Sequence, residues 1–266
     1  MGDGSGLRSE IRDGVGTLTF DRPKHRNALS PRMLQELHET LRDWADRDAV
    51  RVVILRGAGD TAFSSGFDIA AIPTGSGAEG QRRRSETPPL ALAWTRVKQF
   101  PYPTLAMVNG YCFGAALHLA LCCDLRVGAD DIAVGMPAAR LGIVYPPDGI
   151  AQFVAVLGVA RAREVFLTGR TYRGTEVGAM RLVDRQVPRA ELEPTVRGLA
   201  REISANAPLA LRGLKRILNR IEAAAPLGQE ALREAEALVA EALASDDARR
   251  AQRAFLERRG SRTSRT

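Results

Sequence analysis

Two stretches of the sequence decide its fold: Ala62-Phe63-Ser64-Ser65-Gly66-Phe67-Asp68-Ile69 and Val108-Asn109-Gly110-Tyr111-Cys112-Phe113-Gly114-Ala115-Ala116. In each, a strand leads into a tight turn of small residues, and the second turn opens a helix. Such turns leave backbone N–H groups without partners. Two donors of this kind that converge on one point form an oxyanion hole, and small side chains let a ligand approach the backbone closely.

Strand and helix patterns alternate on both sides of these two stretches. Val15–Phe20 alternates and predicts a strand, and Ser30-Pro31 predicts a helix start with Ser as the N-cap. Further strands are predicted near residues 50–55, 103–108, 124–127 and 132–134, and further helices near 114–121, 149–157 and 159–168. Residues 1–10 look frayed, and the Pro-, Gly- and Ser-rich stretch 73–89 predicts a mobile loop. The alternation predicts an α/β core with both sheet faces covered.

The composition changes near residue 190. Residues 190–259 are almost entirely helix formers, interrupted at Pro208 and Pro226, and show no strand pattern. We therefore predict a core over residues 1–195 and a helical C-terminal region over 196–266. This region is poor in aromatic anchors, so we expect it to pack on the core or on a neighbouring subunit.

Bulk properties narrow the function classes. Of the 266 residues, 45% are hydrophobic and 26% charged, as in an ordinary soluble globular protein. The net charge of +7 fits a polyanionic partner, for example nucleic acid or a phosphate-bearing cofactor, but much of it lies in Arg82–Arg84 and in the C-terminal tail, where a solvated surface explains it equally well. No aromatic-interleaved basic patch supports nucleic-acid binding, and no apolar run reaches membrane-spanning length.

The cysteines and the N-terminus suggest a compartment. Cys112, Cys122 and Cys123 lie in one apolar stretch without metal-ligand spacing, so no zinc site is predicted and a reduced, cytoplasmic interior is expected. The N-terminus is rich in Gly and charge and lacks the apolar region of a signal peptide.

Several ordered motifs resemble the crotonase superfamily, the enoyl-CoA hydratase/isomerase family, along about residues 10–260. The resembling stretches are Asp21-Arg22-Pro23-Lys24-His25-Arg26-Asn27-Ala28-Leu29-Ser30, Val52–Leu55 with Gly57-Ala58-Gly59, Phe63–Ile69, Asn109–Gly114, Cys123–Arg126 and Leu167–Arg170. The resemblance implies an α/β fold, the crotonase (ClpP-like) spiral of ββα units, with a helical C-terminal trimerisation region. It also implies acyl-CoA substrates, no cofactor beyond the coenzyme A of the substrate, and a homotrimer or dimer of trimers.

The resemblance also assigns roles to residues. By position, the backbone N–H groups of Phe67 and Ala115 are the oxyanion donors. Coenzyme A and thioester contacts fall on His25, Arg26, Ala62, Ser64, Ser65, Gly66, Asp68, Ile69 and Gly114, while Phe255 falls where relatives close the pantetheine channel. For the side chains of His25 and Arg26, a plain surface turn is an equal alternative. Asp68 is interpreted as shaping its loop.

Two positions depart from the hydratase pattern. Relatives that hydrate enoyl thioesters use two Glu residues; here the first position is His118, and the second, after Pro137, is Ala138. His118, three residues beyond Ala115, either acts as an acid or base or packs as a core histidine. Asp148 either removes a proton or caps the helix that begins near Gly149.

The remaining group near these positions is Tyr145, a donor to the thioester or to Asp148, or else a wall residue. With one carboxylate available, one-base chemistry such as a double-bond shift suits the residues better than hydration. The resemblance thus favours a lyase or isomerase of this family. Decarboxylation of a malonyl-type thioester and a non-catalytic acyl-CoA-binding relative are the alternatives.

Overall fold

The computed structural model describes residues 6–68 and 89–222, together with isolated residues between 229 and 257. Strands form two sheets. The larger sheet contains, in spatial order, β1 (Leu7–Arg12), β2 (Val15–Phe20), β3 (Val52–Gly57), β5 (Thr104–Val108), β7 (Leu125–Ala129) and β10 (Arg185–Val187). The smaller sheet contains β4 (Ala62–Ser64), β6 (Tyr111–Phe113), β8 (Ala133–Gly135) and β9 (Thr171–Arg173). Among the strands of the described residues, the β1–β2 and β8–β9 pairs are antiparallel and the other pairs are parallel.

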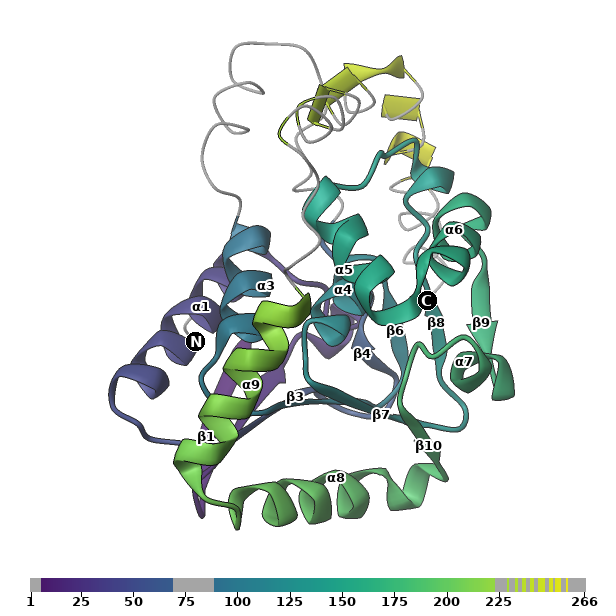
Figure 1. The fold of residues 1–266 in the computed structure, drawn as a ribbon. Helices are drawn as coiled ribbons and strands as arrows, with labels where there is room; N and C mark the ends of the chain where they lie inside the picture. Colours follow the sequence, from purple (N-terminus) through teal and green to yellow (C-terminus); the bar gives the residue numbers. More distant parts are fainter. Residues whose placement is uncertain are drawn as a thin grey trace.

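Successive strand pairs divide between the two sheets. β3, β5 and β7 each join the larger sheet, and the strand that follows each of them, β4, β6 or β8, joins the smaller one. Helical chain follows each of these strand pairs among the described residues, so the repeated unit is two strands followed by helical chain (Figure 1). The predicted spiral of ββα units is therefore confirmed.

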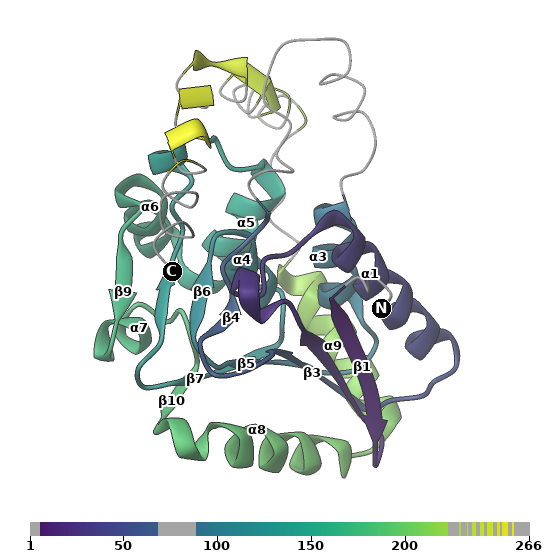
Figure 2. The ribbon, with the colours of Figure 1, turned by 180° about the vertical axis from the view of Figure 1, so that it is seen from behind.

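Helices cover the sheets on opposite sides. In chain order they are α1 (Pro31–Asp46), α3 (Pro89–Gln99), α4 (Ala115–Leu121), α5 (Pro147–Leu157), α6 (Val159–Thr168), α7 (Thr175–Ala179), α8 (Arg189–Ser204) and α9 (Pro208–Glu222). Figures 1 and 2 show α8 along one face of the larger sheet, with α4, α5 and α6 on the other side of the molecule. The elements on that second side carry the residues of the predicted site.

Strong local signals in the sequence are confirmed. The Ser30 hydroxyl accepts a hydrogen bond from the Met33 backbone N–H at 3.2 Å and caps α1. The apolar face of α1 is buried as predicted, and Gly169 ends α6 in the left-handed conformation.

Where the sequence pattern is weaker, the strand β1 and the helix α3 were not predicted. Residues 7–10 are not frayed, because β1 pairs with β2 along its whole length. The α3 helix was not predicted, since it follows directly on the Pro- and Gly-rich stretch that predicts a loop. Most of that stretch, residues 73–88, lies outside the described residues, as do residues 1–5.

The described part of the C-terminal region, through residue 222, is helical and contacts the core. Pro208 begins α9. The helical run is therefore interrupted between α8 and α9, as this proline predicts. The Lys215 ammonium of α9 is buried and donates to the Asp124 carboxylate at 2.7 Å and to the Tyr102 carbonyl at 3.0 Å. In the described part of the chain, no helix has the length and apolar character needed to cross a membrane.

Candidate functional site

The backbone N–H of Phe67 points away from the neighbouring segment around Leu29. Leu29 donates from its N–H to the Gly66 carbonyl at 2.9 Å, and the Leu29 carbonyl accepts from the Asp68 N–H at 3.0 Å. This is the parallel bridge between Leu29 and Phe67, in which the bonds go to the residues on either side of Phe67. The Phe67 N–H is consequently left on the opposite side of the chain.

The two predicted donor turns lie against each other. A Cβ placed on Gly66 would lie 2.7 Å from the Phe113 carbonyl oxygen and 3.7 Å from the Ala115 nitrogen. Gly66 also has a φ of +100°, so glycine is required here both by conformation and by space. Neither Phe67 nor Ala115 donates from its N–H in any hydrogen bond among the described residues. The first turn thus lies against Ala115 of the second, and within the described residues neither N–H group has an acceptor.

His118 is buried one helical turn beyond Ala115. Its side chain is 3% exposed, its Nδ1 lies 3.2 Å from the Tyr145 hydroxyl oxygen, and its ring stacks on Trp94 with 3.7 Å between centroids. Burial, with a smaller contribution from the Lys98 charge, lowers the pKa of His118 to about 3. The imidazole is therefore neutral at physiological pH and a weak base.

His118 belongs to a cluster of aromatic side chains. Its members are Trp94, His118, Tyr145, Phe153 and Phe166, with neighbouring ring centroids 3.7–6.3 Å apart. Burial raises the pKa of the Tyr145 phenol well above its ordinary value, so this hydroxyl stays protonated. The Trp94 indole N–H is buried and has no hydrogen-bond partner within the described ranges. Sequence reasoning missed Trp94, although Ala93, Trp94 and Val97 show the spacing of one buried helix face.

Asp148 occupies a different position from the one predicted. The helix α5 begins at Pro147 with Pro146 at the N-cap, so Asp148 lies in the first turn and is not the cap. Proline fits the first helical position because the N–H it lacks would be unpaired there. The Asp148 side chain is exposed, while the adjacent Gly149 packs against the rings of Tyr145 and His118.

Residues 10–263 match the model of the family described as enoyl-CoA hydratase/isomerase. The chain belongs to the enoyl-CoA hydratase/isomerase family. It is 36% identical to the carnitinyl-CoA dehydratase of Escherichia coli (strain K12) over 201 residues, 75% of each protein. It is 30% identical to the hydroxycinnamoyl-CoA hydratase-lyase of Pseudomonas fluorescens over 213 residues, 79% of this chain and 76% of that protein.

A solved structure of the same family superposes along nearly the whole chain. It is a methylmalonyl-CoA decarboxylase in complex with 2-nitronate-propionyl-CoA, with a TM-score of 0.86, 26% identity and 95% of each chain covered. The crotonase fold predicted from the sequence is thereby confirmed.

The residues that the enoyl-CoA hydratase/isomerase resemblance assigns to coenzyme A lie beside the first donor turn. The Ser65 N–H donates to the Arg26 carbonyl at 2.9 Å, and the Ser65 hydroxyl donates to the His25 carbonyl at 3.4 Å. His25 and Arg26 are exposed, and the Arg26 guanidinium lies 5.5 Å from the centre of the Tyr111 ring. This arrangement leaves two basic side chains at the surface next to Ser65.

The other assigned residues support the turn from within. Ala62 and Ser64 are buried in β4, and the Ser64 hydroxyl accepts from the Gly66 N–H at 3.1 Å. Asp68 pairs with Arg22 at 3.5 Å, which fits the interpretation that it shapes the loop. Ile69 and Phe255 lie outside the described residues. Within the residues that the structure describes, no group of three metal-ligating side chains comes together.

Proposed function

We propose that this protein binds an acyl-CoA thioester and decarboxylates a malonyl-type acyl group. The thioester oxygen accepts hydrogen bonds from the N–H groups of Phe67 and Ala115, which stabilise the enolate that forms. Donors fixed in advance on developing negative charge supply the largest contribution to many acyl reactions. The convergence of the two turns at Gly66 supports this assignment.

The choice of reaction rests on the burial of His118, which makes its imidazole a weak base. A double-bond shift needs a base at the α- or γ-carbon, and a group whose pKa is about 3 is a poor base at neutral pH. Its Nδ1 is engaged by Tyr145, and Ala138 offers no functional group. Decarboxylation needs no base, because the electron pair comes from the bond to the carboxylate.

The step balances without a cofactor. The bond between the α-carbon and the carboxylate carbon breaks and releases CO₂, and its electron pair forms the enolate, whose charge rests on the thioester oxygen. A proton then adds to the α-carbon. Because the raised pKa of Tyr145 makes it a weak acid, we assign this proton to water and give Tyr145 and His118 the role of positioning the acyl group.

The family comparisons support an acyl-CoA substrate. Two solved structures that cover 95% of this chain are described as methylmalonyl-CoA decarboxylase with 2-nitronate-propionyl-CoA and with 2S-carboxypropyl CoA. Their TM-scores of 0.86 and 0.85 mean that their backbone path closely resembles that of this chain. The exposed Arg26 offers positive charge for the phosphates of coenzyme A, and the exposed His25 offers a ring nitrogen for a hydrogen bond.

Turnover of a small substrate panel tests the proposal. Malonyl-CoA, methylmalonyl-CoA, crotonyl-CoA and a 3-enoyl-CoA are incubated with the purified protein, and products are separated by mass. We expect CO₂ release from a malonyl-type substrate and, in D₂O, one deuterium at the α-carbon. Binding of thioesters without turnover of any substrate would instead indicate a non-catalytic acyl-CoA-binding protein.

One-base chemistry at Asp148 is the second candidate. Asp148 directly precedes Gly149, which packs on the Tyr145 and His118 rings, so its carboxylate lies next in sequence to a residue of the cluster's wall. The 36% identity to a dehydratase also favours proton abstraction. Asp148→Asn separates the two reactions: it abolishes a double-bond shift or dehydration but leaves decarboxylation largely unchanged.

A further inference from the structure

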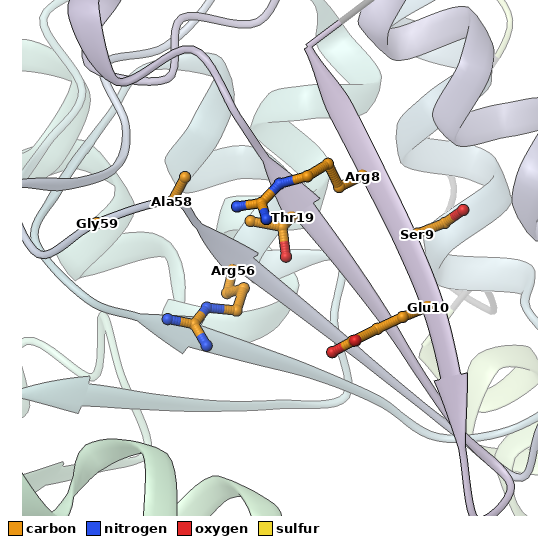
Figure 3. Close-up of a pocket in the computed structure, with 7 residues that line it drawn as sticks. All are labelled: Arg8, Ser9, Glu10, Thr19, Arg56, Ala58 and Gly59. Atoms are coloured by element: carbon orange, nitrogen blue, oxygen red, sulfur yellow. The ribbon is translucent and has the colours of Figure 1, made fainter.

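A pocket on the larger sheet presents two arginines and a hydroxyl in one row. The strand register places Arg8 of β1 opposite Thr19 of β2, and Thr19 opposite Arg56 of β3. Laterally paired residues share one face of a sheet, so the three side chains lie side by side. Figure 3 shows the guanidinium groups of Arg8 and Arg56 on either side of the Thr19 hydroxyl, in a pocket of about 310 Å³.

This pocket is separate from the proposed thioester site. Arg56 pairs with Glu193 of α8 at 3.2 Å, so its side chain lies on the sheet face that α8 covers. The donor turns and α4 lie on the other side of the molecule (Figures 1 and 2). None of the residues assigned to the thioester or to coenzyme A lines the pocket.

The guanidinium groups of Arg8 and Arg56 have N–H donors without an acceptor among the described residues. Each carries five N–H donors and a permanent positive charge. Arg56 uses Nη1 for Glu193, while its Nε is buried and has no partner among the described residues. Arg8 uses Nε for Asp21 at 2.7 Å, and no described residue occupies its terminal nitrogens. A buried cationic donor without an acceptor is costly, and a bound anion would remove this cost.

The charges around the pocket also favour an anion, because the ion pairs there join four arginines (Arg8, Arg12, Arg56 and Arg197) with three carboxylates (Glu10, Asp21 and Glu193). Among the lining residues, Glu10 is the acid against the two arginines. Its carboxylate lies 3.2 Å from the Arg12 guanidinium, which offsets that negative charge. Guanidinium groups match the oxygens of phosphate, and a hydroxyl such as that of Thr19 donates to a third oxygen.

We propose that the pocket formed by Arg8, Thr19 and Arg56 binds a phosphoryl group. The pocket is larger than a phosphate ion, so it accepts the phosphoryl group of a small phosphate ester as well as inorganic phosphate. These two sources share the same recognition chemistry, and the probes below distinguish them.

Isothermal titration of the full-length protein tests this site with inorganic phosphate, glycerol 3-phosphate and, as a control for ionic strength, potassium chloride. We expect saturable binding of one phosphoryl group per chain. Arg8→Gln and Thr19→Val each remove a donor, and Arg8→Gln weakens binding about tenfold because charge-assisted hydrogen bonds are the stronger ones. Tighter binding of glycerol 3-phosphate than of phosphate identifies an ester as the ligand, and the reverse order identifies the free ion.

Arg42→Gln is the matched control. Arg42 is exposed on α1 and does not line the pocket. Equal binding by wild type and Arg8→Gln, equal loss in Arg42→Gln, or no saturable binding of either probe overturns the proposal. Arg56→Gln is tested as a further variant, with circular dichroism to verify its fold.

Discussion

The Nδ1 atom of His118 lies 3.2 Å from the hydroxyl oxygen of Tyr145 and joins α4 to the segment that precedes α5. The bond lies inside the aromatic cluster, where Trp94 stacks on the imidazole. Because the interior has a low dielectric, such a bond is stronger than in water, and an unmatched partner is more costly. The pair therefore holds in place the residue at the position that the family resemblance assigns to a hydratase carboxylate.

Removing the hydroxyl of this pair is expected to destabilise the fold. Tyr145→Phe leaves the buried His118 Nδ1 without its partner, which costs about 1–3 kcal/mol. Denaturant unfolding followed by circular dichroism measures the change. Tyr111→Phe is the control, since no described residue bonds its hydroxyl, and we expect it to stay within about 0.5 kcal/mol of wild type. Equal stability of the two variants would show that the 3.2 Å contact contributes nothing.

The free energy of unfolding is expected to decrease as the pH is lowered, because His118 is neutral in the folded protein. Its pKa is about 3 in the fold and near 6.5 when the chain is unfolded. Between these values the unfolded chain binds a proton that the folded chain does not, so this group lowers the free energy of unfolding by up to about 1.4 kcal/mol per pH unit as pH drops from 6.5 towards 3.

Urea unfolding at several pH values checks this slope. The double variant His118→Leu with Tyr145→Phe removes both partners of the bond and should flatten the curve in that range. His25→Gln keeps His118 and should follow the wild-type slope. A double variant with an unchanged slope would mean that other groups cause the pH dependence.

Substitution of Gly66 is expected to abolish activity by displacing the donor turns. A Cβ at this position would lie 2.7 Å from the Phe113 carbonyl, and the φ of +100° strains any other residue. Because shifts of about 1 Å in a catalytic group cost about 100-fold in rate, we expect at least that loss of kcat/KM in Gly66→Ala. Gly158→Ala is the control: its φ is +78°, but nothing lies within 4 Å of the added methyl group. Similar activities in both variants would remove the support for the donor pair.

Local patterns predicted the fold wherever a periodic segment was long. The buried face of α1 and the alternation of β2 were readable because they repeat over several residues. The strands β9 and β10, with the sequences Thr-Tyr-Arg and Arg-Gln-Val, have no apolar run and were missed. Their places are set by pairing with β8 and β7, contacts between segments far apart in the sequence.

In the candidate site, too, local features were predicted, while contacts between distant segments were not. Gly66 was singled out from its turn, and its conformation and close contacts agree. The N-cap prediction for Asp148 was wrong, because two prolines before it start the helix earlier. The stacking of Trp94 on His118 connects α3 with α4, and no pattern within either helix indicates which ring the other will meet.

The buried Lys215 is expected to hold α9 on the core. Its ammonium donates to Asp124, whose carboxylate also accepts from the backbone N–H and the hydroxyl of Thr104. Lys215→Met removes one partner of this pair. Loss of one partner from a buried pair costs about 3–5 kcal/mol, and we expect about 3 kcal/mol because Asp124 is partly exposed. Arg216→Met, one residue away and exposed, should change stability by less than about 0.5 kcal/mol. Hydrogen exchange that shows α9 unfolding while the core stays protected would contradict the prediction that α9 and the core unfold together.

An exposed apolar stripe on α9 leads to a prediction about assembly. Leu214, Ile217, Leu218 and Ile221 are 57–67% exposed and recur at the spacing of one helix face. Exposed apolar surface of this kind is typical of subunit contacts, and the family resemblance implies a homotrimer or dimer of trimers. We expect analytical ultracentrifugation to give three or six chains for the wild type. Leu218→Glu places a charge in the stripe and should shift the protein towards monomers, while Arg216→Glu outside the stripe should not. A monomeric wild type, or a Leu218→Glu variant that assembles fully, would show that the stripe is not a subunit contact.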